Sequence, residues 1–235
     1  MNIVITGATK GIGKAIVFAF AEDHTPHHFF VCARNAEGLA ALKQEVENKY
    51  PQHKADTFSC DMADKKEVQS FAAFILGKIH AVDMLVNNAG IYFPGSCYNE
   101  EEGVLEKMLE VNLLSAYRLT RALLPGMMQE KKGQIFNMCS IASLEAYSNG
   151  GSYSISKFAL AGFTKNLREE LKPFGIKVTG VYPGATMSDS WAGSGVDENR
   201  LMEAADVAQT IHAAAYLSER AVVEDIVLRP QLGDL

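Results

Sequence analysis

The fold is decided by the stretch Asn2-Ile3-Val4-Ile5-Thr6-Gly7-Ala8-Thr9-Lys10-Gly11-Ile12-Gly13. Its first five residues form a short apolar run typical of a strand, and its glycines have the spacing Gly-x-x-x-Gly-x-Gly. Ile12, Ile16 and Phe20 then recur at helical spacing. This is the context of a dinucleotide site, because glycines let the backbone approach a pyrophosphate and the helix N-terminus stabilises its charge. An ordinary turn before an amphipathic helix is the alternative.

Outward from this stretch, strand-like and helix-like segments alternate to the end of the chain. We expect strands near residues 2–6, 28–33, 55–59, 83–86, 133–138, 176–181 and 226–228. We expect helices near residues 12–22, 36–49, 64–79, 101–130, 152–172 and 203–217. The fourth helix should be interrupted around 110–112, and Pro125 with Gly126 should loosen it near its end. The alternation predicts an α/β fold with one Rossmann-type, doubly wound parallel sheet of about seven strands and helices on both faces.

Composition favours one domain, residues 1–235, with a core that needs no disulfide or metal. The hydrophobic content of 48% excludes disorder, and the net charge of −6 argues against nucleic acid and anionic membranes as main partners. Four cysteines without a Cys-x-x-Cys motif favour reduced thiols in a cytoplasm. The first strand starts at residue 2, so we expect no signal peptide, and no apolar run approaches the ~18 residues of a membrane span. His27 and His28 are expected in a loop or at a strand edge, with no metal site.

A possible proton donor lies in Tyr153-Ser154-Ile155-Ser156-Lys157. The i, i+4 spacing places the phenol and the ammonium on one helix face. Lowering a phenol pKa from ~10 to ~7 takes about 4 kcal/mol. One positive charge about 4 Å away supplies roughly that at an effective dielectric near 20. We therefore expect Lys157 to lower the pKa of Tyr153 and make it a general acid or base, although this motif alone also occurs by chance on surface helices.

Together these segments resemble the short-chain dehydrogenase/reductase family over nearly the whole chain. Further motifs in the family's order are Asn87-Asn88-Ala89-Gly90, Val111-Asn112, Ser140 after a strand, and Pro183-Gly184. The resemblance implies that Tyr153 donates its proton to a carbonyl oxygen as hydride arrives from the nicotinamide, or removes it in the reverse direction. It implies that Ser140 holds the substrate oxygen and that Lys157 also binds the nicotinamide ribose. Asn112 is expected to hold a water linking Lys157 to solvent. A helix cap for Asn112 and a turn residue for Ser140 are the alternatives.

The charges near the glycine turn indicate NADP(H) as the cofactor. NAD-selective sites place a carboxylate about 20 residues past the glycines, where this chain has Ala33, followed by Arg34. Arg34 and Lys10 suit a 2′-phosphate, with two solvated surface charges as the alternative. Thr186 is expected at the nicotinamide carboxamide, a role that Ser188 fills if the family's usual spacing holds. The expected cofactor-binding residues are Gly7, Thr9, Lys10, Gly11, Ile12, Gly13, Arg34, Asp61, Met62, Asn88, Ala89, Gly90, Tyr153, Lys157, Pro183, Gly184 and Thr186.

Substrate recognition is expected from the C-terminal residues and an aromatic wall. Residues 222–230 with Gly233 and Asp234 resemble bacterial sepiapterin-reductase-like members of the family, in which an acid near the C-terminus can anchor the pterin amines. Asp234 is the candidate anchor, and a frayed terminal acid is the alternative. Residues 183–203 are expected to form a substrate lid, with a merely mobile loop as the alternative. The aromatic candidates, which ordinary packing would also explain, are Tyr92, Phe93, Tyr147 and Trp191.

The leading hypothesis is a cytoplasmic NADPH-dependent carbonyl reductase of small soluble substrates such as sepiapterin or diketones, working as a homodimer or homotetramer. The runner-up is a 3-oxoacyl-thioester reductase of fatty-acid synthesis. It would need a basic patch for an acidic carrier protein, with Arg118, Arg121, Lys131 and Lys132 as candidates. A non-catalytic NADP(H)-sensing module is the alternative from another class, and such modules commonly lose the tyrosine or lysine that this chain keeps.

Overall fold

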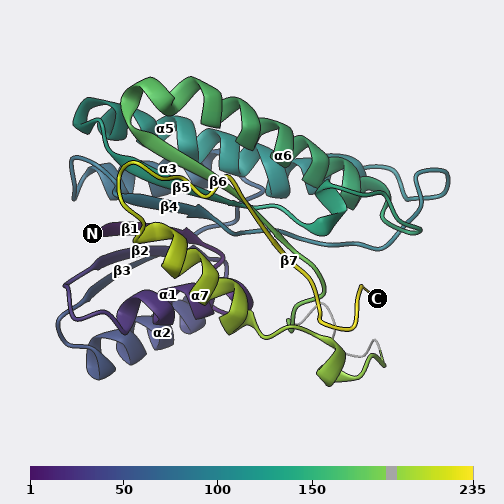
Figure 1. Ribbon diagram of the computed structural model, residues 1–235, viewed down its shortest axis with the longest axis horizontal. Helices are drawn as coiled ribbons and strands as arrows, with labels where there is room; N and C mark the ends of the chain where they lie inside the picture. The colour runs from purple at the N-terminus through teal and green to yellow at the C-terminus, as the bar shows by residue number, and fades with distance from the viewer. Residues whose placement is uncertain (189–194, 235) are drawn as a thin grey trace.

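The computed structural model describes residues 1–188 and 195–234. Within these residues the chain forms a seven-stranded sheet in the order β3-β2-β1-β4-β5-β6-β7, with every neighbouring pair parallel (Figure 1). The strands are β1 (Asn2–Thr6), β2 (His28–Ala33), β3 (Lys54–Ser59), β4 (Met84–Asn87), β5 (Gly133–Met138), β6 (Ile176–Pro183) and β7 (Asp225–Leu228). The predicted α/β fold with one doubly wound parallel sheet is confirmed.

Helices cover both faces of the sheet (Figure 1). One face carries α1 (Gly11–Ala21), α2 (Ala36–Lys49) and α7 (Ala204–Ala215), and the other carries α3 (Lys65–Leu76), α5 (Ser115–Glu130) and α6 (Gly151–Leu171). The shorter helical segments are α4 (Val104–Leu109), η1 (Glu110–Leu114), η2 (Ile141–Ser143), η3 (Lys172–Phe174) and η5 (Glu198–Arg200).

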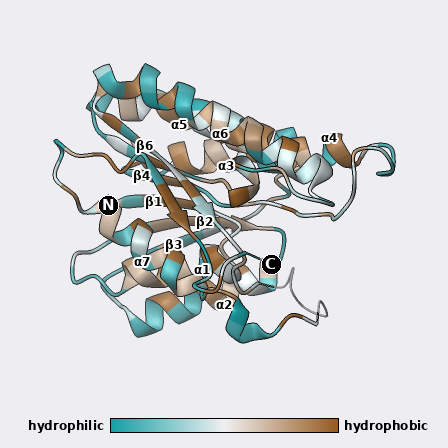
Figure 2. Ribbon diagram, turned by 45° about the vertical axis from the view of Figure 1, so that its right-hand side comes forward, coloured by the Kyte–Doolittle hydropathy of each residue, from teal (hydrophilic) through white to brown (hydrophobic). Residues whose placement is uncertain are grey.

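Each face of the sheet buries its own hydrophobic cluster, because successive side chains of a strand point to opposite faces. In β1, Ile3 and Ile5 pack with Phe20 of α1, whereas Val4 belongs to the cluster that contains Leu119 of α5. Figure 2 shows that hydrophobic residues concentrate on the central strands of the sheet.

The region predicted as one helix over residues 101–130 is divided, as expected near 110–112, by the π-helical turn η1. The expectation that Pro125 and Gly126 loosen its end is wrong, because α5 continues through both residues to Glu130. A Cβ on Gly126 would lie 2.6 Å from the carbonyl oxygen of His80. The glycine therefore permits a close approach between α5 and the loop before β4, and it does not end the helix.

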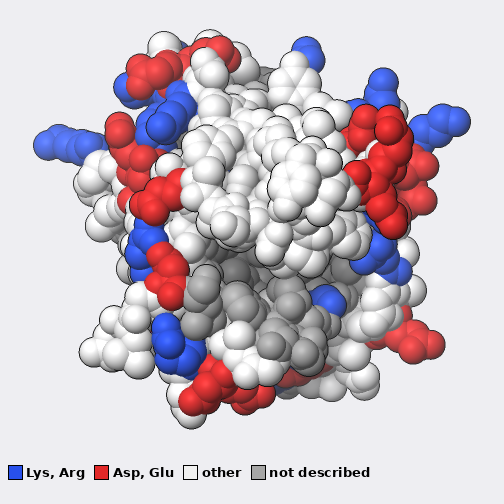
Figure 3. Space-filling model, turned by 90° about the vertical axis from the view of Figure 1, so that its right-hand side faces the viewer, with Lys and Arg blue, Asp and Glu red and all other residues white. Residues whose placement is uncertain are grey.

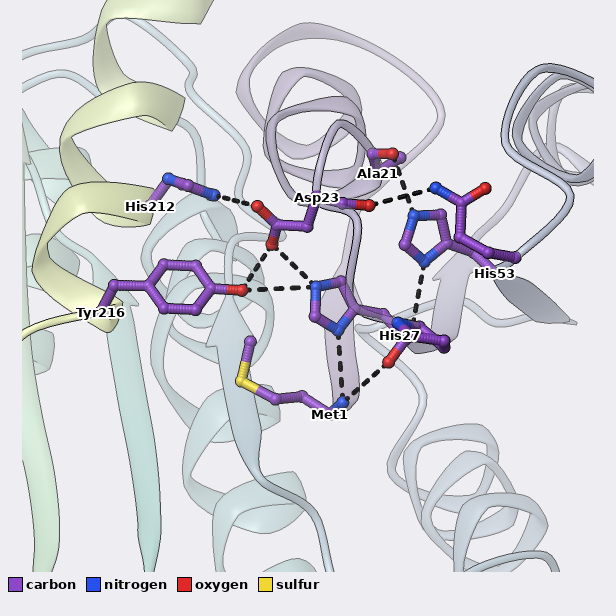
Figure 4. Close-up of polar contacts among 9 residues, drawn as sticks. Met1, Ala21, Asp23, His27, His53, His212 and Tyr216 are labelled. Carbon is purple, nitrogen blue, oxygen red and sulfur yellow. Dashed lines mark hydrogen bonds and ion pairs between the residues drawn. The ribbon is translucent and has the colours of Figure 1, made fainter.

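At the amino edge of the sheet, a polar network centred on Asp23 joins the end of α1 to α7 (Figure 4). The Asp23 carboxylate binds Nε2 of His27 at 2.8 Å and Nε2 of His212 at 2.9 Å, and it accepts a hydrogen bond from the Tyr216 hydroxyl. His53 accepts a hydrogen bond from the backbone N–H of His27 at 2.9 Å. His27 is 3% exposed. Its predicted location is confirmed, since it lies in the loop directly before β2, but it is no filler, because it belongs to a buried network that reaches His53 and Tyr216.

Candidate active site

The motif residues gather at the carboxyl edge of the sheet, where β1, β4, β5 and β6 end. The strand order reverses between β1 and β4, which neighbour each other at the centre of the sheet. In open parallel sheets, ligands bind outside the carboxyl ends of the strands at such a reversal. The fold therefore places the glycine turn beside the segments that follow β4, β5 and β6.

The glycine turn after β1 is fixed by hydrogen bonds to the segment after β4. Nδ2 of Asn88 donates to the carbonyl oxygens of Thr6 at 2.8 Å and Gly7 at 3.1 Å, and the Asn88 backbone N–H donates to Thr6 Oγ1 at 3.0 Å. Gly7 has a φ of +67°, a region that favours glycine. A Cβ on Gly13 would lie 2.5 Å from Asn88 Nδ2. Asn88 therefore fixes the conformation of the glycine turn through its hydrogen bonds to Thr6 and Gly7.

The start of α1 has the features of an anion cradle. Lys10, its N-cap residue, makes no side-chain capping hydrogen bond, and the first turn carries no acidic residue. By contrast, α2 and α3 are capped by the side chains of Asn35 and Asp64. A Cβ on Gly11 would meet only Ser188, at 3.9 Å, so the described residues leave space over the turn. Helix N-termini of this kind suit a phosphate group, so these residues fit a dinucleotide.

The residues expected around the adenosine lie at the same edge of the sheet, but the side chain of Met62 does not face the surface there. Arg34 follows β2 and has an exposed side chain, and Asp61 follows β3. Met62, in contrast, is buried in the core, with its sulfur 3.7 Å from the Sγ atoms of Cys32 and Cys60. Only the backbone of Met62 remains available to a ligand at this edge.

The four side chains expected to catalyse the reaction come together from η1, the end of β5 and α6. Ser140 follows β5, and its hydroxyl accepts a hydrogen bond from the Ala142 N–H at 3.1 Å, which caps η2. The same hydroxyl faces the hydroxyl of Tyr153 closely enough to act on its pKa, which it lowers. One turn along α6, Nζ of Lys157 lies 5.8 Å from the centre of the Tyr153 ring and donates to the Met138 carbonyl oxygen at 2.7 Å.

Asn112 lies in the π-helical turn η1, a distortion that is frequent at functional sites. Its Nδ2 donates to the Ile91 carbonyl at 3.0 Å and to Ser156 Oγ at 2.9 Å, while its Oδ1 accepts from the Ile91 N–H at 2.8 Å. A Cβ on Gly90 would lie 3.3 Å from Asn112 Oδ1 and 3.5 Å from Lys157 Nζ. Asn112 and Lys157 therefore converge on Gly90, which leaves room for both.

Burial governs the proton affinity of the central pair. It raises the pKa of Tyr153 above its ordinary value, although the Ser140 hydrogen bond acts in the opposite direction. Burial also lowers the pKa of Lys157 to about 8. The sequence led us to expect a tyrosine pKa lowered by Lys157, and the direction found is the reverse. The physical reason is that desolvation disfavours the charged form of both groups, and the ammonium is directed toward the Met138 carbonyl.

Two of the expected aromatic residues flank Tyr153. The Tyr92 ring meets the Tyr153 ring edge-on, with 4.9 Å between centroids. Burial and the neighbouring hydroxyls of Tyr92 and Tyr153 raise the pKa of Tyr147. Phe93 is directed elsewhere, since its ring packs under the Lys107 ammonium at 5.1 Å. Trp191 lies outside the described residues.

The C-terminal residues reach the same edge of the sheet. A Cβ on Gly184 would lie 3.1 Å from Asp234 Oδ1. The Asp234 carboxylate forms an ion pair with Arg229, which also binds Glu145 at 3.1 Å. Thr186 is buried, and its hydroxyl donates to the Gly184 carbonyl at 3.0 Å. Asp234 is thus close to the site, but its carboxylate already has a cationic partner.

Sequence reasoning missed two residues that hold this site together. Ser156 is buried and links Asn112 to the carbonyl oxygen of Tyr153, to which its hydroxyl donates at 2.7 Å. Its position between Tyr153 and Lys157 in the sequence could have indicated that Ser156 belongs to the site. Glu100 binds the start of α6 through Ser152, 52 residues away, and no local pattern announces such a contact.

The surface at this edge is largely uncharged at its centre. Figure 3 faces the edge and shows a broad uncharged area in its upper middle, with acidic and basic side chains mainly around the rim. No helix within residues 1–188 and 195–234 is long and apolar enough to cross a membrane. The same residues contain no group of three or more His, Cys, Asp or Glu placed to hold a metal ion.

Comparisons with known proteins agree with this arrangement. A family model described as short chain dehydrogenase matches residues 1–199. Sepiapterin reductase from Chlorobaculum tepidum is 32% identical, over 99% of this chain and 97% of its own length. The structure of a metagenomic short-chain oxidoreductase in complex with NADP has a TM-score of 0.84 at 28% identity, covering 98% of this chain and 97% of that one. An alcohol dehydrogenase from the archaeon Thermococcus sibiricus, complexed with 5-hydroxy-NADP, has a TM-score of 0.89 at 25% identity, covering 98% and 96%.

Proposed function

This chain belongs to the short-chain dehydrogenase family and is a nicotinamide-dependent oxidoreductase, and from that premise we propose that it is an NADPH-dependent carbonyl reductase. Its substrates are small ketones or aldehydes of the sepiapterin or diketone type. The observation that carries the proposal is that Ser140, at the end of β5, acts on the Tyr153 hydroxyl, with Lys157 one turn along α6 and its Nζ 5.8 Å from the centre of the Tyr153 ring. The hydroxyls of Ser140 and Tyr153 would both reach one substrate oxygen at the carboxyl edge of the sheet.

The cofactor would be held by the turn after β1 and the segments after β2 and β4. The open N-terminus of α1 suits the pyrophosphate, and the cations Arg34 and Lys10 suit a 2′-phosphate. When bound, the nicotinamide supplies the hydride that reduces the carbonyl carbon. Lys157 and Asn112, which converge at Gly90, would bind the ribose and return a proton from solvent. The NADP bound in the similar metagenomic oxidoreductase supports this cofactor choice.

In carbonyl reduction, Tyr153 would donate the proton that the substrate oxygen requires. Its raised pKa keeps the phenol protonated at neutral pH, the form that a proton donor needs. Ser140 would donate a hydrogen bond to the same oxygen and hold it at the tyrosine. Ser156 and Asn112 support the helix turn behind Tyr153 through the hydrogen bonds described above.

The substrate class rests on the relative and on the aromatic rim. The sepiapterin reductase of C. tepidum is similar over almost the whole chain. Tyr92 and Tyr147 flank Tyr153, where they would pack against a flat substrate. Asp234 lies near Gly184, where its carboxylate would meet the polar edge of that substrate. The lid that the sequence predicts over residues 183–203 lies partly outside the described residues, of which it includes 183–188 and 195–203.

The thioester alternative is less well supported, because the expected basic patch is not assembled. Arg118 is paired with Glu110, with 2.5 Å between Nη1 and Oε2. Lys131 and Lys132 follow the end of α5 and precede β5, which places them at the amino edge of the sheet, away from Tyr153. We further propose that the enzyme works in the cytoplasm as a homodimer or homotetramer.

A screen of NADPH oxidation tests the proposal. The substrates are sepiapterin, small diketones, acetoacetyl thioesters and simple aldehydes, each compared with NADH in place of NADPH. We expect turnover of sepiapterin or diketones with a preference for NADPH. Turnover restricted to acetoacetyl thioesters would establish the alternative, and tight NADPH binding without turnover of any of these substrates would favour the sensing module.

A further inference from the structure

The loop that connects β4 to α4 is fastened to the start of α6. The backbone N–H of Gly95 donates to the Asn149 carbonyl at 3.1 Å, and the Ser96 hydroxyl donates to Asn149 Oδ1 at 3.0 Å. Farther along the loop, Glu100 Oε1 accepts from the Ser152 N–H at 2.9 Å, and Glu100 Oε2 accepts from the Ser152 hydroxyl. Both side-chain contacts of Glu100 therefore converge on one residue in the first turn of α6.

The start of α6 depends on this carboxylate because it has no local cap. Its N-cap residue is Gly150, which has no side chain, and its first turn contains no acidic residue. A carboxylate at a helix N-terminus satisfies a free N–H and interacts favourably with the helix dipole. Gly151 makes the approach possible, because a Cβ there would overlap the Glu100 carboxylate and lie 2.6 Å from the Gly95 carbonyl oxygen. Glu100 thus caps α6 from a distant part of the chain.

Tyr153 directly follows the residue that Glu100 holds. The same loop also carries Tyr92, whose ring packs edge-on against the Tyr153 ring. The Ser140 hydroxyl acts on the hydroxyl of Tyr153, whose pKa it lowers. The loop therefore holds the residue before Tyr153 through Glu100 and contacts the Tyr153 ring through Tyr92.

We propose that Glu100 is a positioning residue for carbonyl reduction, which fixes Ser152 and so keeps the Tyr153 hydroxyl against Ser140. This inference rests on the proposed function, in which Tyr153 is the proton donor. A displacement of about 1 Å at a reacting group can cost about 10²-fold in rate, so a helix start released from its cap would slow the reaction without touching the cofactor site.

The test compares three variants for kcat and for NADPH affinity measured by fluorescence titration. Glu100→Ala removes both contacts, and we expect kcat to fall about tenfold or more while the NADPH Kd stays within about twofold. Glu100→Gln keeps an acceptor for the Ser152 N–H and a group that can bind the Ser152 hydroxyl, so it should recover most of the wild-type kcat. Glu101→Ala, at the exposed neighbouring position, is the matched control and should behave as wild type.

A pH profile separates positioning from a general loss of structure. Burial raises the pKa of Tyr153 and the Ser140 hydroxyl lowers it, so a tyrosine that loses contact with Ser140 while its ring stays buried should deprotonate at higher pH. For oxidation of the product alcohol, where Tyr153 acts as the base, we expect the midpoint of the kcat profile to move to higher pH in Glu100→Ala. It should stay in place in Glu100→Gln. Tyr92, Tyr147, Lys157 and Cys139 face the tyrosine in all three proteins and remain unchanged.

Wild-type kcat and an unshifted profile in Glu100→Ala would overturn the inference. The inference would also be overturned if Glu100→Ala lost kcat and NADPH affinity to the same extent and Glu100→Gln did not restore kcat. If Glu100→Ala does not fold, Ser152→Ala removes the hydroxyl contact alone, and an unchanged kcat in that variant would also overturn it. The proposed function is tested separately by Tyr153→Phe. If that variant stays active, the proposed function itself fails. If Tyr153→Phe is inactive while Glu100→Ala has the wild-type kcat, only the positioning role of Glu100 fails.

Discussion

At Tyr153, burial and a hydrogen bond act in opposite directions on one proton. Burial raises the tyrosine pKa, and the Ser140 hydroxyl partly offsets that effect. Lys157 has a pKa lowered to about 8 by the same desolvation, so its charge also depends on pH close to neutrality. The raised pKa leaves the phenol protonated at neutral pH, whereas the reverse reaction requires a phenolate and should gain rate as pH rises.

Cofactor choice should depend on Arg34. Removing it in Arg34→Ala deletes a charge-assisted contact of about 1.5–3 kcal/mol, so NADPH should bind roughly ten- to hundredfold more weakly while NADH changes much less. Fluorescence titration of both cofactors measures the effect, and Lys43→Ala on α2 is a control for the loss of one surface cation. Equal weakening of NADPH and NADH would show that Arg34 does not bind the 2′-phosphate.

Asp234 should distinguish a pterin from a simpler carbonyl compound. If its carboxylate accepts hydrogen bonds from a pterin's amino edge, Asp234→Asn should lower kcat/KM for sepiapterin about tenfold or more and leave a small diketone nearly unaffected. The ion pair with Arg229 holds the carboxylate in place near Gly184, so Arg229→Gln should reproduce part of the loss. A parallel decline for both substrates would instead indicate a loosened C-terminus.

At the scale of elements, the sequence predicted the strands closely because most of them carry a short apolar run, such as Ile3–Ile5 in β1 and Met84–Val86 in β4. It also predicted the division of the fourth helix around residues 110–112, where η1 lies. The role of Gly126 inside α5 was not predictable, because its close approach to the His80 carbonyl joins segments that lie far apart in the chain. The cap of α6 by Glu100 could not be predicted from the sequence for the same reason, since its partner Ser152 lies 52 residues away.

The network between α1 and α7 should make stability depend on pH. Burial lowers the pKa of His27, although its hydrogen bond with Asp23 acts in the opposite direction. Below the ordinary histidine pKa of ~6.5, the unfolded chain therefore binds a proton that the folded protein takes up less readily. We expect the free energy of unfolding to fall as pH decreases from about 7.5 to 5.5, as measured by urea denaturation.

Two histidine variants isolate this effect. His27→Asn should be less stable at pH 7.5 but should show a flatter dependence on pH. His24→Asn, at an exposed neighbouring position, should keep the wild-type dependence. His28, whose pKa burial also lowers, contributes in the same direction and remains in both variants. An unchanged pH dependence in His27→Asn would show that this network does not sense pH.

At the scale of the whole molecule, the parallel sheet separates two edges with different chemistry. The glycine turn, Asn87–Gly90, Ser140 and Pro183-Gly184 lie at the ends of strands, and carboxyl ends of parallel strands share one edge, so their assembly at that edge could be predicted. The pairing of Asp234 with Arg229 and the direction of the pKa shift at Tyr153 could not, because both depend on burial and on contacts between distant segments.

The exposed face of α6 should form a subunit contact. Ile155 and Phe158 are each 44% exposed there, and exposed apolar side chains on one helix face favour association. We expect light scattering after size-exclusion chromatography to give a dimer or tetramer for the wild type and a smaller species for Phe158→Glu. Leu76→Glu, at an exposed apolar position on α3, is the matched control and should leave the mass unchanged. A monomeric wild type, or an unchanged mass in Phe158→Glu, would contradict this assembly.

The central claim is that Tyr153 supplies the proton for NADPH-dependent carbonyl reduction. Its most direct test is kcat for the best substrate in Tyr153→Phe, together with the Kd for NADPH. The variant keeps the ring that packs against Tyr92 and loses only the hydroxyl. We predict that kcat falls by at least about 10²-fold while NADPH affinity stays nearly the same. A Tyr153→Phe enzyme that reduces the carbonyl at close to the wild-type rate would contradict the account.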